Sequence, residues 1–150
     1  NDAHHMTAPR PDGAQAARAM AGALRNAGVP PAAVGYVNAH GSSTVLNDST
    51  ECRAIRLALG EHADHVAVSS TKGAHAHALG ATGAFETAIT ALAIDRGHLP
   101  GTVNLVDKDP ACDLDVIGPC GRAERVDCAI TNAFGFGGIN ASLVLGRATE

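Results

Sequence analysis

Helix-like and strand-like patterns alternate along this chain, and this alternation constrains its fold more than any other feature of the sequence. Apolar residues at helical spacing are separated by short apolar runs that suit buried strands. Helices are predicted over 14–27, from Asn47 or Asp48 onward and over 79–96, and strands over 34–39, 66–69, 126–132 and 139–146. This order is typical of α/β layering, in which helices cover a sheet. A length of 150 residues with 45% apolar content suits one domain over residues 1–150.

The same patterns predict which faces are buried. The first helix is expected to bury one face, made of Ala17, Met20, Leu24 and Ala27, and to end at Gly28. The helix over 79–96 is apolar nearly all round, which predicts burial on both sides. The last strand is expected to turn its apolar set to the core, namely Ile139, Ala141, Leu143 and Leu145. Asn47 or Asp48 is expected to cap the second helix, with Glu51 as the acidic residue of a capping box.

Composition excludes several classes of function. The net charge of −4 provides no basic surface for nucleic acid or an anionic membrane. No apolar run approaches the ~18–20 residues that span a bilayer, and no signal peptide is visible, so a cytoplasmic protein is expected. The four cysteines form no CxxC pair and no zinc spacing, and we interpret them as reduced structural thiols. Because the chain starts at Asn1 rather than at an initiator methionine, we expect a fragment of a longer protein.

The stretch 69–84, SSTKGAHAHALGATGA, concentrates residues that can carry chemistry. His40 directly follows one predicted strand and His77 follows another after a short loop, and groups at strand ends meet at one rim of an α/β sheet. His77 also precedes a helix N-terminus, whose positive dipole end disfavours the charged imidazole. Two neutral imidazoles there could donate to one carbonyl oxygen. The alternative is that each histidine only satisfies a backbone group.

A second expected pair joins Lys72 to Glu86. Glu86 is the only charged residue inside an otherwise apolar helix, and burying it without a partner would be costly. Lys72 is the expected partner. The pair has two compatible interpretations: it fixes the loop, or it orients the site.

Two further motifs leave alternatives open. His75 and His77 could form a metal pair, as in a metal hydrolase, but no third ligand stands at a familiar spacing, and no metal site is predicted. The loop 134–138, FGFGG, is not a phosphate cradle. Its backbone N–H groups could point at an oxyanion, with Phe134 and Phe136 as apolar walls. Otherwise it is a tight hairpin with two core phenylalanines.

Three ordered motifs resemble signatures of the β-ketoacyl-ACP synthases, specifically the type II (elongating) condensing enzymes and their type II polyketide synthase relatives. They are VNAHGSST at 37–44, SSTK at 69–72 followed by His77, and NAFGFGGIN at 132–140. The resemblance covers essentially the whole chain but only the C-terminal half of the family. It implies a thiolase-like fold, with two similar halves stacked as α-β-α-β-α and a mixed five-stranded sheet in this half.

The resemblance also implies an acyltransferase function. The family joins an acyl group, held as a thioester on a cysteine, to malonyl-ACP with loss of CO2, in fatty acid or polyketide biosynthesis. His40 and His77 would be the catalytic histidines that hold the malonyl carbonyl and stabilise the enolate. The other implied catalytic residues are Lys72 with Glu86 as a supporting ion pair and Phe136, whose N–H supplies half of an oxyanion hole. Implied substrate-binding residues are Ser42 and Thr44 on the pantetheine arm, Phe136, whose ring would gate the acyl pocket, and Phe134 and Gly137.

The nucleophilic cysteine of the family lies in its N-terminal half, and no cysteine here has its setting; Cys52 is the only conceivable substitute. The chain is therefore expected to act only with that half, as a homodimer or a ketosynthase-type heterodimer, on acyl carrier protein. No cofactor is expected, because the phosphopantetheine arm is carried by the acyl carrier protein. The alternative is a non-catalytic ketosynthase-like subunit that shapes a pocket or scaffold. Two departures from the family pattern are Ser42, where Thr is usual, and Ala76, where Gly usually precedes the histidine.

Overall fold

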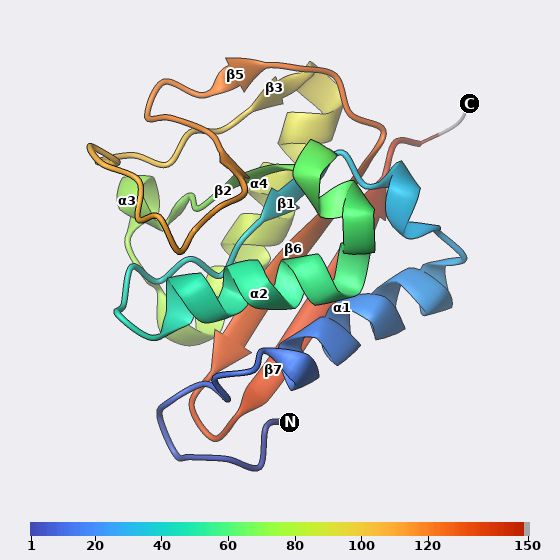
Figure 1. Cartoon of the computed structure of the whole chain (residues 1–150). Helices are drawn as coiled ribbons and strands as arrows, with labels where there is room; N and C mark the ends of the chain where they lie inside the picture. Colours follow the sequence, from blue (N-terminus) through green and yellow to red (C-terminus); the bar gives the residue numbers. More distant parts are fainter. Residues whose placement is uncertain (149–150) are drawn as a thin grey trace.

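Helices cover both faces of a five-stranded mixed sheet in the computed structural model, which describes residues 1–148 (Figure 1). The larger elements are α1 (Ala14–Ala27), α2 (Asn47–Leu59), α3 (Lys72–His75), α4 (Thr82–Arg96), β1 (Tyr36–Asn38), β2 (Ala67–Ser69), β4 (Asp115–Val116), β6 (Cys128–Gly135) and β7 (Ile139–Gly146). The five strands lie in the order β4-β2-β1-β6-β7, with β6 and β7 antiparallel and the other neighbours parallel. β3 (His98–Leu99) and β5 (Arg122–Ala123) form a separate pair. The predicted α/β layering and mixed five-stranded sheet are confirmed.

The first helix has the predicted bounds and nearly the predicted inner face. α1 buries Ala17, Met20 and Leu24, and Gly28 ends it in the left-handed conformation. Ala27 is exposed, so the prediction that it lies on the inner face was wrong. The chain turns at Gly28, and Val29 packs against the core in its place.

The two central strands are shorter than predicted, but they fix the geometry of the site. β1 and β2 hold three residues each, and all six are buried. They run parallel in a register that pairs Tyr36 with Ala67 and Asn38 with Ser69. The segments that follow them, which carry His40 and Lys72, therefore leave the sheet at the same edge.

Helix α4 buries polar residues along much of its length, and apolar residues, Ala93 and Ile94, near its C-terminal end. The inward positions include Thr82, Glu86 and Thr90, spaced four residues apart, and Asn38 Nδ2 donates to Thr90 Oγ1 at 3.1 Å. Phe85 is 51% exposed. The prediction of burial on both sides was therefore wrong for this chain: the sheet covers one side of the helix, and the described residues leave the other side open.

Strand β7 also turns a different face to the core from the one predicted. Its polar residues point inward: Asn140 Nδ2 donates to Asp2 Oδ1 at 2.6 Å, and Ser142 Oγ donates to Asn132 Oδ1 at 2.7 Å. The prediction that the apolar set faces the core was wrong for Ile139, Ala141 and Leu143, which are exposed, whereas Leu145 packs against a core cluster. The alternation of apolar and polar residues separates the two faces of a strand, but it does not identify the face that packs against a layer of helices.

These exposed side chains form one surface. Leu145, which shares a strand face with Ile139, packs against the core cluster that contains Ala93 and Ile94 of α4, so that face of β7 lies on the α4 side of the sheet. On this side of the sheet, two residues of α4 and two of β7 are exposed, and we call these four the open apolar face: Phe85, Leu92, Ile139 and Leu143.

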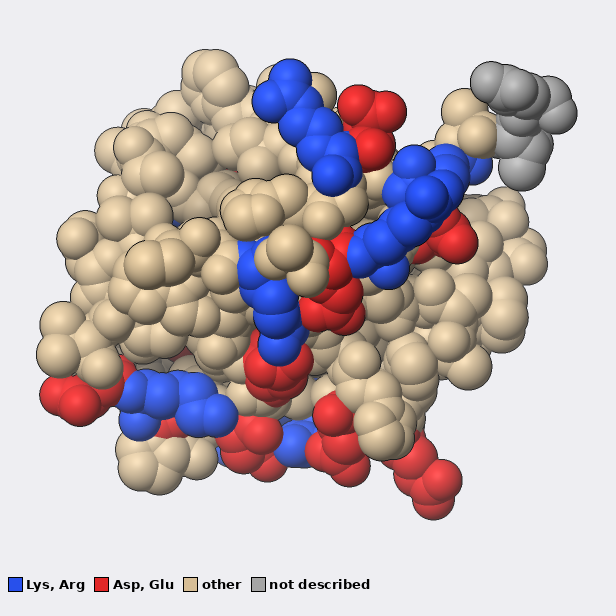
Figure 2. Space-filling model, turned by 90° about the horizontal axis from the view of Figure 1, so that it is seen from above, with Lys and Arg blue, Asp and Glu red and all other residues tan. Residues whose placement is uncertain are grey.

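Elsewhere, charged side chains lie close to groups of opposite sign (Figure 2). Arg56 pairs with Asp64 at 2.8 Å and Arg147 with Asp127 at 2.7 Å. Exposed pairs of this kind contribute little to stability. Among the described helices, none is long and apolar enough to cross a membrane.

Candidate active site

The segment after β1 is held by the buried carboxylate of Glu51. The backbone N–H groups of His40 and Gly41 each donate to it at 2.9 Å, and Asn132 Nδ2 donates at 3.1 Å. Burial raises the pKa of this carboxyl, and these three hydrogen bonds oppose that rise. Since these partners are all donors, the site fits the ionised form, and Glu51 fixes the backbone that carries His40.

The predicted capping roles at the start of α2 were wrong. The residue before the helix is Leu46, which makes no side-chain cap, and Asn47 is the first residue of the helix. Asp48 accepts from the Ser43 N–H at 3.1 Å, outside the helix. Glu51, one turn into the helix, reaches back to the segment after β1, where the N–H groups of His40 and Gly41 donate to it.

Close contact between the segments after β1 and β2 requires glycine at position 41. Gly41 has φ +41°, and a Cβ there would lie 2.4 Å from Ser70 Cβ. Ser70 Oγ also donates to the Gly41 carbonyl at 2.8 Å. The two segments are thus packed against each other directly.

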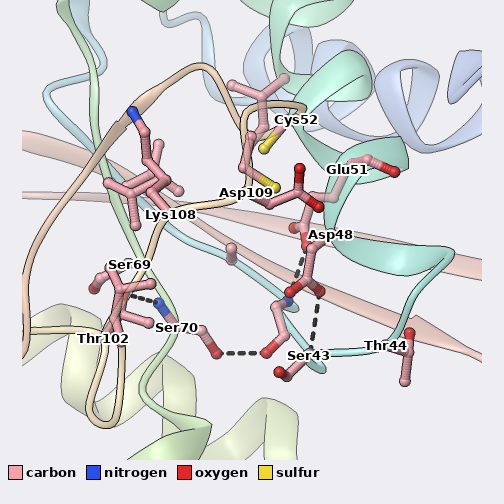
Figure 3. Close-up of a pocket in the computed structure, with 18 of the residues that line it drawn as sticks. Ser43, Thr44, Asp48, Glu51, Cys52, Ser69, Ser70, Thr102, Lys108 and Asp109 are labelled. Atoms are coloured by element: carbon pink, nitrogen blue, oxygen red, sulfur yellow. Dashed lines mark hydrogen bonds between the residues drawn. The ribbon is translucent and has the colours of Figure 1, made fainter.

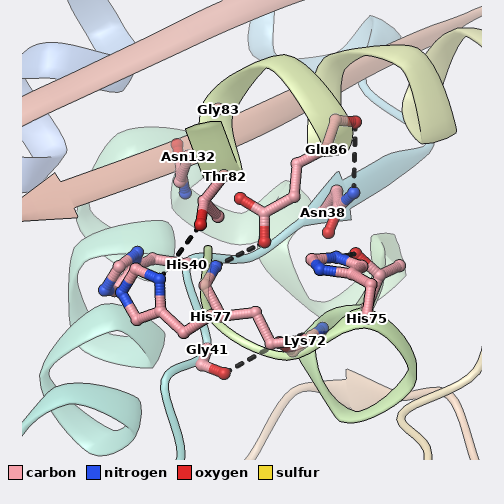
Figure 4. Close-up of polar contacts among 12 residues, drawn as sticks. Asn38, His40, Gly41, Lys72, His75, His77, Thr82, Gly83, Glu86 and Asn132 are labelled. Carbon is pink, nitrogen blue, oxygen red and sulfur yellow. Dashed lines mark hydrogen bonds and ion pairs between the residues drawn. The ribbon is translucent and has the colours of Figure 1, made fainter. Parts of the chain in front are cut away.

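The two histidines converge at this edge of the sheet, as predicted from the strand ends (Figure 4). The ring centroids of His40 and His77 are 5.3 Å apart and the planes meet at 79°. His40 is buried, with the Phe134 ring 5.7 Å away, whereas His77 is exposed. A ligand that reaches His77 from solvent therefore also meets the more deeply placed His40.

Hydrogen bonds identify the tautomer of His77. The backbone N–H of Leu79 donates to His77 Nδ1 at 3.2 Å, and Thr82 Oγ1 lies 3.0 Å from the same nitrogen. Since a backbone N–H can only donate, Nδ1 carries no proton, and the proton is on Nε2. Burial and the Lys72 charge also lower the pKa of His77. The ring is therefore a neutral donor through Nε2.

The imidazole of His40 is neutral as well. Burial is the main cause, followed by the charge of Lys72 and the neighbouring His77, and together they lower its pKa to about 3. Its Nδ1 is buried and makes no hydrogen bond within residues 1–148. At neutral pH the two rings therefore carry no charge.

Lys72 and Glu86 form the predicted ion pair beneath the histidines (Figure 4). Lys72 is 7% exposed and Glu86 0%, so the pair is removed from solvent. Burial raises the pKa of the Glu86 carboxyl, and the Lys72 ammonium opposes that rise. The pair gives Glu86 the partner that it needs and sets a positive charge near both rings.

The remaining candidate residues differ in their exposure and in their contacts. Ser42 Oγ and Thr44 Oγ1 are 3.2 Å apart. Phe134 is half-buried against the core, but Phe136 is 75% exposed, so the hairpin does not contain two core phenylalanines. The Gly137 N–H, in the same turn, donates to the Met6 carbonyl at 2.7 Å.

His75 and His77 bond to different groups. His75 Nε2 lies 3.0 Å from Thr71 Oγ1, and its Nδ1 lies 2.7 Å from the Ala76 carbonyl. Within the part of the chain that the structure describes, no three His, Cys, Asp or Glu side chains are grouped as metal ligands.

A cavity of about 370 Å³ lies beside this site (Figure 3). Ser43 and Thr44 line it from the segment before α2, and Thr102 and Lys108 from the long loop after β3. Neither His40 nor His77 is among the residues that line it, so the cavity is separate from the imidazole pair.

Ala76, which precedes His77, has a backbone conformation that suits glycine. Its φ is +62° and its ψ 174°, a region almost restricted to Gly. We predict that Ala76→Gly raises the free energy of unfolding by about 1 kcal/mol, because relief of strain exceeds the greater chain entropy of glycine. Chemical denaturation measures this. The matched control, Ala74→Gly in α3, should instead destabilise the protein; equal losses in both variants would contradict the assignment of strain.

Comparisons with known proteins agree with this geometry. The family described as beta-ketoacyl synthase, C-terminal domain, matches residues 1–106. A 3-oxoacyl-(acyl-carrier-protein) synthase 2 from Synechocystis is 52% identical over 142 residues, covering 95% of this chain and 34% of that protein. The enzyme of the same name from Coxiella burnetii is 47% identical over 149 residues, covering 99% and 36%. The chain therefore spans about a third of the length of these relatives.

Solved structures show the same fold. A chain in a complex of a type II PKS acyl-carrier protein with its ketosynthase superposes with a TM-score of 0.96 at 38% identity, covering 99% of this chain and 36% of that one. A beta-ketoacyl synthase from Burkholderia phymatum gives 0.91 at 40% identity, covering 99% and 35%. The fold is therefore the thiolase-like fold of the ketosynthases. By sequence and structure alike, this chain belongs to the β-ketoacyl synthase family and corresponds to the C-terminal domain of that family.

Proposed function

We propose that this chain is the half of a condensing enzyme that generates the nucleophilic enolate. The complete enzyme would join an enzyme-bound acyl thioester to malonyl-ACP with loss of CO2, in fatty acid or polyketide synthesis. One observation carries the proposal: two imidazoles, both neutral by their surroundings, lie with ring centroids 5.3 Å apart at the same strand edge. Two neutral N–H donors in that arrangement suit one oxygen atom on which charge develops.

The chemistry follows from this placement. The malonyl thioester carbonyl accepts hydrogen bonds from His40 and His77. As the bond to the carboxylate breaks and CO2 leaves, its electron pair moves toward the carbonyl oxygen and gives an enolate. The enolate carbon then attacks the acyl thioester, so a carbon–carbon bond forms, the carbon–sulfur bond breaks and the cysteine thiolate is released. The imidazoles stabilise the oxygen without transferring a proton.

The other candidate residues are assigned supporting roles. The Lys72 ammonium lowers the pKa of both imidazoles and so favours their neutral forms. Glu86 keeps that ammonium in place. We assign Ser42 and Thr44 to the pantetheine arm. Phe136 would supply an oxyanion N–H and a mobile ring at the acyl pocket.

The open apolar face supports the requirement for a second half. Phe85 and Leu92 of α4 and Ile139 and Leu143 of β7 expose about half or more of their surface on one side of the sheet. Apolar side chains gathered on one face mark a surface that is covered in the working protein. We propose that the half with the nucleophilic cysteine packs there. Cys52, the one conceivable substitute in this chain, is buried, and burial raises its pKa, which disfavours the thiolate that a nucleophile needs.

Reconstitution tests the function. The complete polypeptide that contains this chain, incubated with acyl and malonyl acyl carrier protein, should release CO2 and form β-ketoacyl-ACP. This chain alone should form no carbon–carbon bond. Normal binding of carrier protein by the complete polypeptide, without condensation, would contradict the proposal and favour a scaffold subunit.

The lowered pKa values of the two imidazoles predict activity in mildly acidic solution. At about pH 5.5 an ordinary imidazole is roughly nine-tenths protonated, but a ring with a lowered pKa stays neutral until the pH falls toward that lower value. We expect the loss of malonyl decarboxylation rate on acidification to be centred below pH 6.5, because both rings stay neutral to a lower pH than an ordinary imidazole. Recovery of the full rate on return to pH 7.5 controls for unfolding. A reversible loss centred near pH 6.5 would show that the donors titrate normally.

A further inference from the structure

Two cysteines from separate segments line the cavity beside the histidine site. Cys52 lies on α2, and Cys112 lies in the loop that precedes β4. Figure 3 shows Cys52 projecting from the helix toward the loop that carries Lys108 and Asp109. Both cysteines are free; Cys52 is buried and Cys112 is half-buried. The cavity of about 370 Å³ is large enough to admit a small reagent.

An adjacent ion pair brings the two residues together. Arg56 follows Cys52 by one helical turn, and its Nε donates to both carboxylate oxygens of Asp113, at 3.0 and 2.9 Å. Arg56 also donates to the Asp113 carbonyl at 3.3 Å. Since Asp113 directly follows Cys112, these bonds hold position 112 against the helix near position 52. Cys112 packs against the core cluster that contains Cys52.

We propose that Cys52 and Cys112 are an oxidisable thiol pair, which low-molecular-weight disulfides convert to a disulfide that ties the loop over 107–113 to α2. The Cys112 thiolate attacks one sulfur of the reagent, whose S–S bond breaks and releases one thiolate. The Cys52 thiolate then attacks the Cys112 sulfur and releases the second. The protein loses two protons and two electrons, and the reagent is reduced to two thiols.

The surroundings make this reaction slow at neutral pH. The pKa of both thiols is raised, mainly because they are buried, so little thiolate is present. The rate should rise about tenfold per pH unit while the thiols remain mostly protonated. Cys52 also follows Glu51, which holds the His40 backbone, so the disulfide would tie down the helical turn that positions the candidate site.

Mass spectrometry of the complete polypeptide that contains this chain tests the proposal. A Cys120→Ser background removes the exposed thiol nearest to Cys112 in sequence. After treatment with 2-hydroxyethyl disulfide, we expect the peptides with Cys52 and Cys112 to be linked, with the loss of two hydrogens. Linkage should be about tenfold faster at pH 8.5 than at pH 7.5.

Two variants test whether the linkage needs Cys112 and the contact between Arg56 and Asp113. Cys112→Ser should abolish the linkage. Arg56→Gln, which keeps both thiols but loses the bidentate contact, should slow it severalfold. The proposal is overturned by a stable mixed disulfide on Cys112 with Cys52 still free, by links only between chains, or by no reaction at pH 8.5 while the denatured protein reacts.

Discussion

Replacing His77 with alanine in the complete enzyme is expected to lower the rate of malonyl decarboxylation by about 10²–10³-fold, the range found when one preorganised oxyanion donor is removed. His77 Nε2 carries the ring proton because Nδ1 accepts the Leu79 N–H, and alanine removes this donor from the developing enolate. Single-turnover release of CO2 from saturating malonyl-ACP measures the effect on chemistry directly.

The matched control is His75→Ala, in the same short segment. His75 bonds to Thr71 and to the Ala76 carbonyl rather than to the proposed substrate position, so its loss should change the rate far less. Thermal unfolding of both variants shows that each is folded. Equal rates in wild type and His77→Ala, together with the same result for His40→Ala, would favour the scaffold alternative.

Lys72→Ala is expected to destabilise the protein by about 3–5 kcal/mol, the usual cost of leaving one member of a buried ion pair without its partner. Glu86 is fully buried, and its other carboxylate oxygen, Oε2, makes no hydrogen bond within residues 1–148. Chemical denaturation of the complete protein measures the loss. The raised pKa of Glu86 would let the variant take up a proton on folding, so its stability should improve as the pH falls.

Two comparisons separate charge from packing. The double variant Lys72→Met/Glu86→Leu removes both charges and should recover most of the stability lost by Lys72→Ala. Arg56→Ala breaks two ion pairs at the surface, with Asp64 and Asp113, and should have a smaller effect. If Lys72→Ala is no worse than Arg56→Ala, then the ion pair does not stabilise the fold.

The elements and the strand-end histidines were predictable because they depend on local patterns. Periodicity alone located α1, and the runs before His40 and Lys72 located β1 and β2. Parallel strands end at one edge, which is why His40 and His77 could be expected to meet. The partner of Glu86 followed from the cost of an unpaired buried charge.

What the sequence left undetermined depends on contacts between distant segments. The local sequence predicts a capping role for Glu51, because the N–H groups of His40 and Gly41 lie beside it only in the folded chain. Asn132 donates to Glu51 across 81 residues, which no local pattern reports. The buried polar face of α4 was missed because periodicity cannot say which side of a mostly apolar helix meets the sheet.

The proposed catalysis requires both imidazoles to donate to one oxygen atom, and isotope-edited infrared spectroscopy measures this most directly. A non-decarboxylating malonyl thioester analogue with a labelled carbonyl would be bound to the complete enzyme and to its His40→Ala and His77→Ala variants. We predict a carbonyl stretch at lower frequency than in water, and a shift back to higher frequency in each variant. A frequency that either substitution leaves unchanged, with the analogue still bound, would show that the two rings do not share that oxygen.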